Sequence, residues 1–508
     1  MTMTSAPEFP TFAQVYDAGK PQLVWRILVA DLETPVSAFL KLAEGQAHSF
    51  LLESVEGGAV RGRYSVLGMK PDLLWKCVGN QAWINRDART DSESFRPCPV
   101  AEKSGTLASL RALIAESQVD IPAHLPPMSA GLVGYMSYDT VRLVEKLPDN
   151  NPDTIGIPDG IYMRPTVMAV FDNVNGTLTA VVPVWPHASI DSRAAFALAQ
   201  ERLDSVVEAL ERPLPHHPAG AERASHAPNP VPSMSPQDYC DKVRKAKEYI
   251  AAGDIFQVVI SQRLRVPFKL PPFSLYRALR RMNPSPFLVF MNFGDFQLVA
   301  SSPEILVRLR DGKVTIRPIA GTRKRGRDAA EDEALAADLM ADPKELAEHL
   351  MLLDLGRNDV GRVAKIGSVS VTKKMFVEYY SHVMHIVSNV EGDIRDDCDV
   401  MDALMAGFPA GTTSGAPKIR AMEIIDELEP ERRSFYAGCM GYISGNGNMD
   451  SCIALRTTLI KDGTMVVQAG AGIVADSVPE SEHEECMNKA RALVRAAEEA
   501  LEYTLTRQ

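Results

Sequence analysis

Short turn-forming sequences recur between apolar extended segments, and this pattern sets the strongest limit on the fold. The turns are Asn175-Gly176, Gly294-Asp295, Asp311-Gly312, Gly445-Asn446-Gly447 and Asp462-Gly463. Turns of this kind close hairpins, so the sheets should be mainly antiparallel. Helical segments are expected at 238–252, 329–355 and 480–505, between sets of hairpins rather than after every strand. Together these features predict a layered α+β fold.

One segment, from Arg212 to Pro236, divides the chain near its middle. Pro, Ala, His and Ser replace the periodic apolar pattern there, which is typical of a linker. We therefore expect one domain over 20–211, a linker over 212–236 and a second domain over 237–506. The linker histidines could form a metal-binding tract, but solvated side chains fit this composition better; they are His216, His217 and His226.

Charge and composition exclude several classes of protein. The chain has 54 Lys and Arg against 65 Asp and Glu, a net charge of -11 that repels nucleic acid and anionic lipid. The best early apolar stretch, residues 23–32, is broken by Arg26, so no signal sequence or membrane span is expected. Seven scattered cysteines form no C-x-x-C pair. We expect a cytoplasmic protein with neither nucleic acid nor a membrane as partner.

Two carboxylates and a cation share one face of the last expected helix. At about 100° per residue, Glu482, Glu485 and Lys489 fall within roughly 60° of one another. A solvated surface face is the commoner interpretation of such a set. A site for a divalent cation is the alternative, and a second helix supports it.

That second helix carries Glu348 on an apolar stripe. Helical spacing aligns this carboxylate with Met351, Leu352 and Leu355. A buried, unpaired carboxylate costs several kcal/mol or takes up a proton, so the position needs a compensating cation. Mg2+ accepts carboxylate and water ligands without any Cys or His, and is the ion we expect here.

The segment from Gly470 to Ala475 follows an expected strand and fits the dinucleotide-binding pattern G-x-G-x-x-A. In a phosphate-binding turn the last of these residues lies in the first turn of a helix. Here extended Ile473-Val474 and then Pro479 come before any helix, which disfavours a nicotinamide or flavin site. The glycines are better explained by a ligand that approaches bare backbone.

Ten motifs in a fixed order point to one family. They are Leu51-Leu52-Glu53-Ser54, Asn283-Pro284-Ser285-Pro286, Ser301-Ser302-Pro303-Glu304, Pro318-Ile319-Ala320-Gly321-Thr322-Arg323, Asp354-Leu355-Gly356-Arg357-Asn358-Asp359, Tyr380-Ser381-His382-Val383-Met384-His385, Pro409-Ala410-Gly411-Thr412, Ala454-Leu455-Arg456-Thr457, Ala469-Gly470-Ala471-Gly472 and Glu482-x-x-Glu485-x-x-x-Lys489. Through this colinear set the chain resembles the chorismate-utilising enzymes and, within them, the large subunits of anthranilate synthase. The resemblance implies two large, mainly antiparallel sheets packed face to face, with helices outside and the active site in a cleft. It also implies a regulatory domain over 20–211 and a chorismate-binding catalytic domain over 237–506.

The same resemblance implies a reaction and a set of site residues. Chorismate and ammonia would give anthranilate and pyruvate with Mg2+ as cofactor, the first step of tryptophan biosynthesis. Glu304 matches the general acid for the departing hydroxyl, and His385 matches the group for proton transfer in pyruvate loss, with His382 a weaker candidate. The other catalytic matches are Thr412 and Gln257; the substrate-binding matches are Gly321, Thr322, Tyr436, Arg456, Gly470, Gly472 and Lys489; the metal-binding matches are Glu348, Glu482 and Glu485. A strand-end surface residue is the alternative for Glu304, and a structural histidine for His385.

Two positions separate the subfamilies. Water-adding relatives, the isochorismate and salicylate synthases, carry a lysine base where this chain has Gln257, and a neutral amide cannot deprotonate water. Aminodeoxychorismate synthases generally have lysine where this chain has Ala320. Ammonia is therefore the expected nucleophile. The alternatives are an aminodeoxychorismate synthase and a catalytically inactive, tryptophan-sensing homologue.

The ammonia donor and the inhibitor are also implied. No cysteine has the G-x-C-x-G context of the family's glutaminase, so we expect a separate glutamine amidotransferase subunit in a hetero-oligomer. L-Tryptophan is the expected feedback inhibitor, bound at Glu53, Ser54, Arg63, Pro286, Phe287, Leu288, Met440 and Gly441. Where the family often has Tyr-Met, Phe287-Leu288 keeps an apolar wall but loses a hydroxyl. A buried strand end is the alternative interpretation of residues 51–54.

Overall fold

The computed structural model describes residues 5–56, 60–215, 229–380 and 383–506 of the 508-residue chain. Its helices are α1 (Phe9–Asp17), α2 (Pro35–Leu42), α3 (Pro99–Ser104), α4 (Thr106–Glu116), α5 (Ser192–Glu211), α6 (Pro236–Ala252), α7 (Pro272–Met282), α8 (Ala329–Ala341), α9 (Pro343–Gly361), α10 (Val400–Gly407), α11 (Lys418–Leu428) and α12 (Pro479–Thr506), with the 3-10 turns η1 (Tyr138–Leu143) and η2 (Gly411–Thr413). Within the described ranges, none of the helices combines the length and the apolar character that a membrane span requires.

In the described part of the chain, 22 strands join in one hydrogen-bonded sheet that has two parts. The first part runs in the order β1 (Gln22–Val29), β10 (Thr177–Val184), β9 (Gly160–Asp172), β5 (Tyr64–Val78), β2 (Ser49–Glu53), β13 (Phe287–Asn292), β14 (Phe296–Ser302), β23 (Thr457–Lys461), β24 (Thr464–Ile473) and β12 (Gln257–Pro267), with the short β11 (Val231–Pro232) and β20 (Gly415–Ala416) beside β12. The second part runs from β7 (Arg96–Pro97) and β6 (Gln81–Asn85) through β5, β9, β8 (Gly131–Met136), β21 (Cys439–Ser444), β22 (Met449–Ile453), β15 (Ile305–Arg310) and β16 (Lys313–Ile316) to β19 (Val383–Asp393), which also pairs with β17 (Ile319–Lys324) and β18 (Ser370–Tyr379). A separate hairpin joins β3 (Val55–Glu56) to β4 (Val60–Arg61).

Two long strands, β5 and β9, belong to both parts. Their ladder is interrupted where Pro71 faces Pro165, since neither proline has an N–H to donate, and the register shifts there. Such a bulge bends a strand and increases its twist. On one side of the bulge β5 pairs with β2 and β9 with β10; on the other side their partners are β6 and β8.

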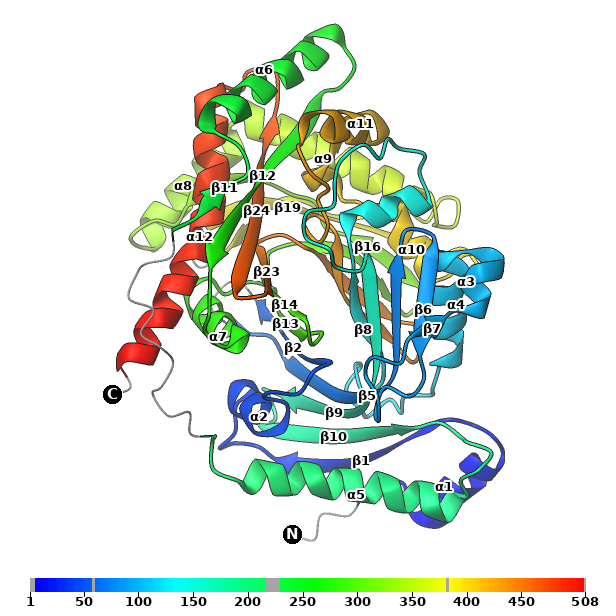
Figure 1. Cartoon of the computed structure of the whole chain (residues 1–508). Helices are drawn as coiled ribbons and strands as arrows, with labels where there is room; N and C mark the ends of the chain where they lie inside the picture. Colours follow the sequence, from blue (N-terminus) through cyan, green and yellow to red (C-terminus); the bar gives the residue numbers. More distant parts are fainter. Residues whose placement is uncertain (1–4, 57–59, 216–228, 381–382, 507–508) are drawn as a thin grey trace.

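The two parts pack face to face. One core contains Val289 and Leu298 from the first part together with Val133 and Ile443 from the second. A second core lies between the other face of the first part and helices α1, α5, α6, α7, α11 and α12, which lie on the outside of the molecule (Figure 1). The expected α+β layers and antiparallel pairing are confirmed. One correction is that β5 and β9 join the expected two sheets into one.

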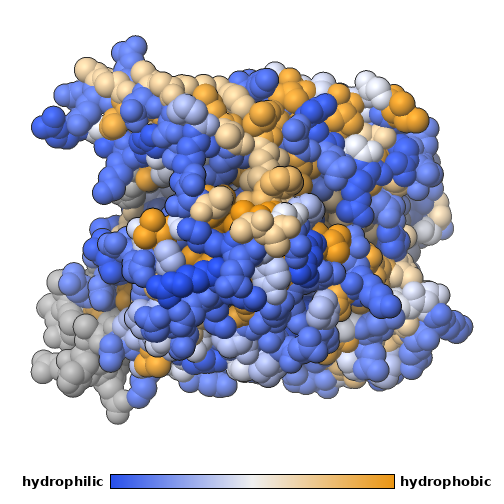
Figure 2. Space-filling model, turned by 90° about the horizontal axis from the view of Figure 1, so that it is seen from above, coloured by the Kyte–Doolittle hydropathy of each residue, from blue (hydrophilic) through white to orange (hydrophobic). Residues whose placement is uncertain are grey.

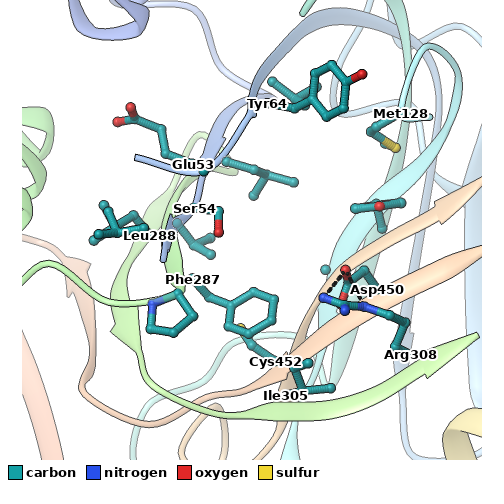
Figure 3. A pocket seen from close by; sticks show the side chains of 18 of the residues that line it. Glu53, Ser54, Tyr64, Met128, Phe287, Leu288, Ile305, Arg308, Asp450 and Cys452 are labelled. Atoms are coloured by element: carbon teal, nitrogen blue, oxygen red, sulfur yellow. Dashed lines mark hydrogen bonds and ion pairs between the residues drawn. The ribbon is translucent and has the colours of Figure 1, made fainter. Parts of the chain in front are cut away.

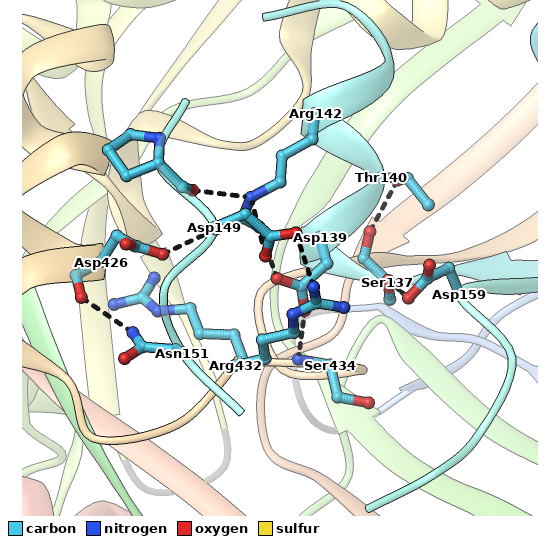
Figure 4. A network of polar contacts seen from close by, with 12 residues as sticks. Ser137, Asp139, Thr140, Arg142, Asp149, Asn151, Asp159, Asp426, Arg432 and Ser434 are labelled. Atoms are coloured by element: carbon cyan, nitrogen blue, oxygen red, sulfur yellow. Dashed lines mark hydrogen bonds and ion pairs between the residues drawn. The ribbon is translucent and has the colours of Figure 1, made fainter. Parts of the chain in front are cut away.

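The segments on either side of the predicted linker share this sheet. β2 pairs with β13 and β8 pairs with β21, so the amino-terminal segment supplies strands beside those of the carboxyl-terminal segment. A polar network reinforces this junction (Figure 4): Arg142 donates to Asp426 at 2.8 Å, and the Ser434 N–H donates to Asp139 at 2.8 Å. The domain limits therefore remain a prediction from sequence. The three linker histidines lie outside the described residues.

All five expected turns close antiparallel hairpins. The helices expected at 238–252 and 480–505 are confirmed as α6 and α12. The single helix expected at 329–355 is wrong, because the chain forms two helices, α8 and α9, that meet at Asp342. Pro343 lacks an N–H and disfavours helical backbone at the preceding residue, and the Asp342 carboxylate caps α9 by accepting from the backbone of Lys344 at 3.0 Å.

Candidate active site

One cavity of about 630 Å3 is lined by every residue that the sequence assigned to catalysis, substrate or metal. These residues are Gln257, Glu304, Gly321, Thr322, Glu348, His385, Thr412, Tyr436, Arg456, Gly470, Gly472, Glu482, Glu485 and Lys489. They come from both parts of the sheet and from α9 and α12, which lie far apart in the sequence. The weaker candidate, His382, lies outside the described residues.

Arg456 provides an uncompensated positive charge. Its backbone has a φ of 47°, which is unusual for a residue with a side chain. Burial lowers the pKa of this guanidinium, although the charges of Tyr380 and Glu304 act in the opposite direction. Among the described residues, no carboxylate forms an ion pair with it. Arg456 is half-buried. An arginine that is partly withdrawn from solvent and has no counter-ion is suited to bind an anionic ligand.

Glu304 lies in the connection between β14 and β15 and is only 5% exposed. The Thr412 hydroxyl donates to its Oε1 at 2.7 Å. Burial raises the pKa of this carboxyl to about 8, despite the opposing effects of Thr412 and Arg456. The group therefore holds its proton near neutral pH and can act as an acid. This degree of burial rules out the alternative of a surface residue at a strand end.

His385 lies on β19, and its orientation is set by β17. Its Nδ1 lies 3.0 Å from the carbonyl oxygen of Gly321 and 3.0 Å from the Thr322 hydroxyl. Because a carbonyl oxygen only accepts, Nδ1 carries the proton and Nε2 is left with a free lone pair. Burial lowers the pKa of His385 to about 4, so the ring is neutral at neutral pH.

Three glutamates of the cavity, Glu348, Glu482 and Glu485, concentrate negative charge. Burial raises the pKa of Glu348 and of Glu482, and the nearby charge of Glu485 raises both further. Lys489 partly offsets this charge through an ion pair with Glu485 at 2.7 Å. The raised pKa values separate Glu348 and Glu482 from an ordinary solvated face. Over the described ranges, however, no three His, Cys, Asp or Glu side chains are spaced to hold a metal ion by themselves.

Sequence reasoning missed four polar residues of this cavity: Lys344, Glu345, Thr413 and Gln468. The positive charge of Lys344 lowers the pKa of both Glu348 and Glu482, opposing the effect of burial. The Asp342-Pro343 pair just before Lys344 could have identified it, because this pair marks the start of α9. Once α9 begins at Pro343, Lys344 stands four residues before Glu348 and therefore on the same helix face.

The glycines of β24 line the cavity, and they also pack closely against β12. A Cβ at Gly472 would lie 2.6 Å from Nε2 of Gln257, and one at Gly470 would lie 2.7 Å from the carbonyl oxygen of Ile260. Packing against the backbone of β12 thus favours glycine at 470 even without a ligand, whereas at 472 only the end of the flexible Gln257 side chain would have to move. The extended backbone continues to Ile473, and α12 begins only at Pro479, so the predicted absence of a dinucleotide turn is confirmed.

A second cavity, of about 520 Å3, is lined by all eight residues proposed to bind tryptophan: Glu53, Ser54, Arg63, Pro286, Phe287, Leu288, Met440 and Gly441. Figure 3 shows that the side chains of Glu53 and Leu288 point away from its centre, whereas the Phe287 ring and the Ser54 hydroxyl border it. The Glu53 carboxylate is occupied by Tyr276 at 2.6 Å and by Arg280 at 2.6 Å. Glu53 and Leu288 therefore border the cavity through their backbone.

Comparison with known proteins gives a consistent assignment. Residues 70–495 match the family described as chorismate binding enzyme. Anthranilate synthase component 1 of Cereibacter sphaeroides is 58% identical over 492 residues, 97% of each chain, and that of Pseudomonas aeruginosa is 49% identical over 93% of this chain and 95% of its own. The crystal structure of anthranilate synthase component I from Streptococcus pneumoniae superposes with a TM-score of 0.74 at 35% identity, covering 92% of this chain and 99% of that one.

A more distant structure, the menaquinone-specific isochorismate synthase of Escherichia coli, shares the fold at 18% identity with a TM-score of 0.68. The family match spans most of the chain, and the closer relatives align over nearly their whole length. The chain therefore belongs to the chorismate-binding enzymes, in the family of anthranilate synthase component 1, and is an enzyme that uses chorismate.

Proposed function

We propose that the chain is the Mg2+-dependent large subunit of an anthranilate synthase, which converts chorismate and ammonia to anthranilate and pyruvate in the first step of tryptophan biosynthesis. One observation carries the proposal: an unpaired Arg456 and a protonated Glu304 line the same cavity. Chorismate is a dianion, so its binding needs an unpaired cation such as Arg456. Its ring hydroxyl is a poor leaving group, so it needs the acid.

The residues divide the reaction between them. Arg456 and Lys489 would attract the substrate carboxylates, while Tyr436 and the backbone of β24 border them. Ammonia adds at ring carbon 2 as the carbon-4 hydroxyl leaves, and Glu304 gives that hydroxyl its proton. In the second half, the proton at ring carbon 2 is removed and the bond from ring carbon 3 to the enolpyruvyl oxygen breaks, which makes the ring aromatic. The released enolpyruvate takes up a proton at its methylene carbon and becomes pyruvate. Nε2 of His385 is suited to accept a proton there, since the substrate's negative charge raises the pKa of a nearby histidine.

Mg2+ would be held by Glu348, Glu482 and Glu485. Concentrated carboxylate charge with raised pKa values fits a hard divalent cation. Because these three side chains do not form a complete ligand set by themselves, water and the ring carboxylate of chorismate would supply the remaining oxygens. When bound, the ion neutralises that carboxylate and fixes its position.

The choice of ammonia over water rests on Gln257. Its amide Nε2 lies 3.5 Å from Oε1 of Glu348, and it has no basic group. Ala320 likewise lines the cavity without an amine, which disfavours an aminodeoxychorismate synthase. In an inactive tryptophan sensor, nothing would require a protonated Glu304 and a neutral His385 in the same cavity as Arg456. Both alternatives fail if anthranilate fluorescence appears with chorismate, Mg2+ and ammonium.

A glutamine amidotransferase subunit would supply ammonia, and an apolar surface near the cavity supports such a partner. Phe256 is 70% exposed, and its N–H donates to Ala416, which places it beside the start of α11 and Ile419. Val478, at the start of α12, is also exposed. Figure 2 shows apolar side chains gathered in the middle of the face seen from above, next to a hollow. Exposed apolar groups of this kind favour protein contact.

Tryptophan would inhibit from the second cavity. Pro303 and Ile319 line both cavities, so the two sites share a wall. Pro303 is bonded to Glu304, and Ile319 precedes Ala320 and Gly321. A ligand that moves this wall displaces the general acid and the carbonyl that orients His385. Coupling of about 1–3 kcal/mol would change chorismate affinity roughly 5- to 150-fold, and chorismate would weaken tryptophan by the same factor.

Glu304→Gln tests the acid and its burial. Turnover should fall by about 10²- to 10⁴-fold, because the amide has no acidic proton. A carboxyl whose folded pKa is about 8 stabilises the fold most below its unfolded value of 4.5 and loses that contribution as pH rises to 8. Between pH 5.5 and 8, the unfolding free energy of the variant, measured with urea, should therefore rise relative to that of wild type. For the surface variant Glu248→Gln, the difference in unfolding free energy from wild type should stay constant over this pH range. A constant difference for Glu304→Gln would refute the buried acid.

Glu485→Gln tests the metal site. Loss of one anionic ligand should weaken Mg2+ and cut ammonia-dependent turnover by orders of magnitude at limiting Mg2+, with partial recovery at high Mg2+. The control is Glu480→Gln, which removes the same charge from the same helix at an ion pair with Arg244. Wild-type Mg2+ dependence in Glu485→Gln would remove this residue from the site.

Phe256→Ser tests the partner surface. Ammonia-dependent activity should be unchanged, whereas glutamine-dependent activity reconstituted with the amidotransferase subunit should require a higher concentration of that subunit. Val174→Ser, at a 75% exposed position in the turn between β9 and β10, is the matched control. Glutamine turnover by the purified chain alone would count against a separate partner. If Phe256→Ser requires the same concentration of the amidotransferase subunit as wild type, this surface does not bind it.

Ser54→Phe tests the tryptophan cavity. The added ring would fill space beside Phe287, and Gly62 already lies so close that its missing Cβ would be 2.6 Å from that of Ser54. We expect near-normal ammonia-dependent activity and strong resistance to tryptophan, measured as the inhibitor concentration for half activity. If the variant remains fully inhibited, tryptophan binds elsewhere.

A further inference from the structure

A third cavity lies at the bend of β5 and β9, apart from the two sites above. It has a volume of about 860 Å3 and is bordered by the ends of α1, α4 and β10 and by α5. Its lining is rich in arginine. The charged side chains are Asp72, Arg86, Asp87, Arg89, Glu116, Arg164 and Arg202. Neither the chorismate site nor the tryptophan cavity includes any of them.

Two of the arginines are compensated. Arg164, beside the proline interruption of β9, donates to both oxygens of Asp72 at 2.8 Å, and its guanidinium stacks over the Trp185 ring at 4.2 Å. Arg86 is paired with Glu116 at 2.7 Å. These contacts use two of the three carboxylates in the lining. The third, Asp87, is exposed to solvent.

The other two arginines have no counter-ion. In the described part of the chain, neither Arg89 nor Arg202 forms an ion pair or a side-chain hydrogen bond. Burial and the like charge of Arg89 lower the pKa of Arg202 to about 10, against the opposing charges of Asp72 and Glu201, neither of which forms an ion pair with it. Arg202 is half-buried and Arg89 is exposed. Their mutual repulsion is unfavourable unless an anion joins them. Nothing in the fold requires this arrangement, because α5 packs through its apolar face.

We propose that this cavity binds a small anion that carries a phosphate group, held between Arg202 of α5 and Arg89 of the segment after β6. One arginine fork satisfies the two oxygens of a carboxylate, whereas the three free oxygens of a phosphate can accept from two forks at once. The volume leaves room for a metabolite attached to the phosphate. Trp185 lines the same cavity, and its buried indole Nε1 has no hydrogen-bond partner among the described residues, so its fluorescence should report occupancy.

The experiment uses the full chain at pH 7.5 without chorismate or Mg2+, so its result does not depend on the proposed reaction. Inorganic phosphate and glycerol 3-phosphate are titrated separately, with sodium chloride at equal ionic strength, while tryptophan fluorescence and heat of binding are recorded. We expect saturable binding of at least one of them. Arg202→Gln should weaken it by tenfold or more, whereas Arg212→Gln, which removes an exposed charge at the end of the same helix, should leave it unchanged.

The two ligands distinguish the source of the phosphate. Equal affinity indicates free phosphate, and tighter binding of glycerol 3-phosphate indicates a phosphorylated metabolite; both support the site. If Arg202→Gln does not fold, Arg89→Gln, at an exposed position, is used in its place and should also weaken binding by tenfold or more. The proposal fails if neither ligand binds more than chloride does, or if the arginine variant that folds binds as tightly as wild type.

Discussion

The bend in β5 and β9 is the constraint on which the rest of the molecule depends. Where Pro71 faces Pro165, the ladder cannot continue, and each strand passes from one part of the sheet into the other. The two parts can then face each other across a shared core. The candidate active site uses this geometry directly, since Gln257 and Gly472 stand on strands of the first part and Thr322 and His385 on strands of the second. Neither part alone carries an acid, a base and a cation together.

Interleaving of the two chain segments has a consequence for regulation. β13 pairs with β2 on one side and with β14 on the other, so the segment bearing Ser54 is hydrogen-bonded into the hairpin that ends just before Glu304. A displacement at the second cavity cannot be absorbed by a loop alone, because well-paired strands move together. The polar network around Arg142 and Asp426 ties the same segments on another side (Figure 4). The proposed coupling between the cavities would act through shared strands and a shared wall rather than through a long chain of contacts.

Local patterns in the sequence were enough to predict the hairpins and the helices α6 and α12. The turn residues defined each antiparallel pair, and helical spacing placed Glu482 with Glu485 and picked out Glu348. What the sequence could not give was long-range partnership. Nothing near Leu52 indicates that its strand pairs with Val289, more than two hundred residues away. The close packing at Gly470 was also hidden, because the atom that a Cβ would meet is the carbonyl oxygen of Ile260 on another strand.

Burial controls the chemistry of the cavity by acting on opposite kinds of group. It raises the pKa of Glu304 and lowers that of His385, so the acid keeps its proton and the base stays neutral in the same place. The cost is that Arg456 stands without a counter-ion while the glutamates repel each other. Under the proposed function, a dianionic substrate would relieve the first imbalance and a divalent cation would relieve the second. Because the substrate carboxylate would also complete the ligand set of the cation, each should increase the affinity for the other, and the empty cavity should bind neither of them well alone.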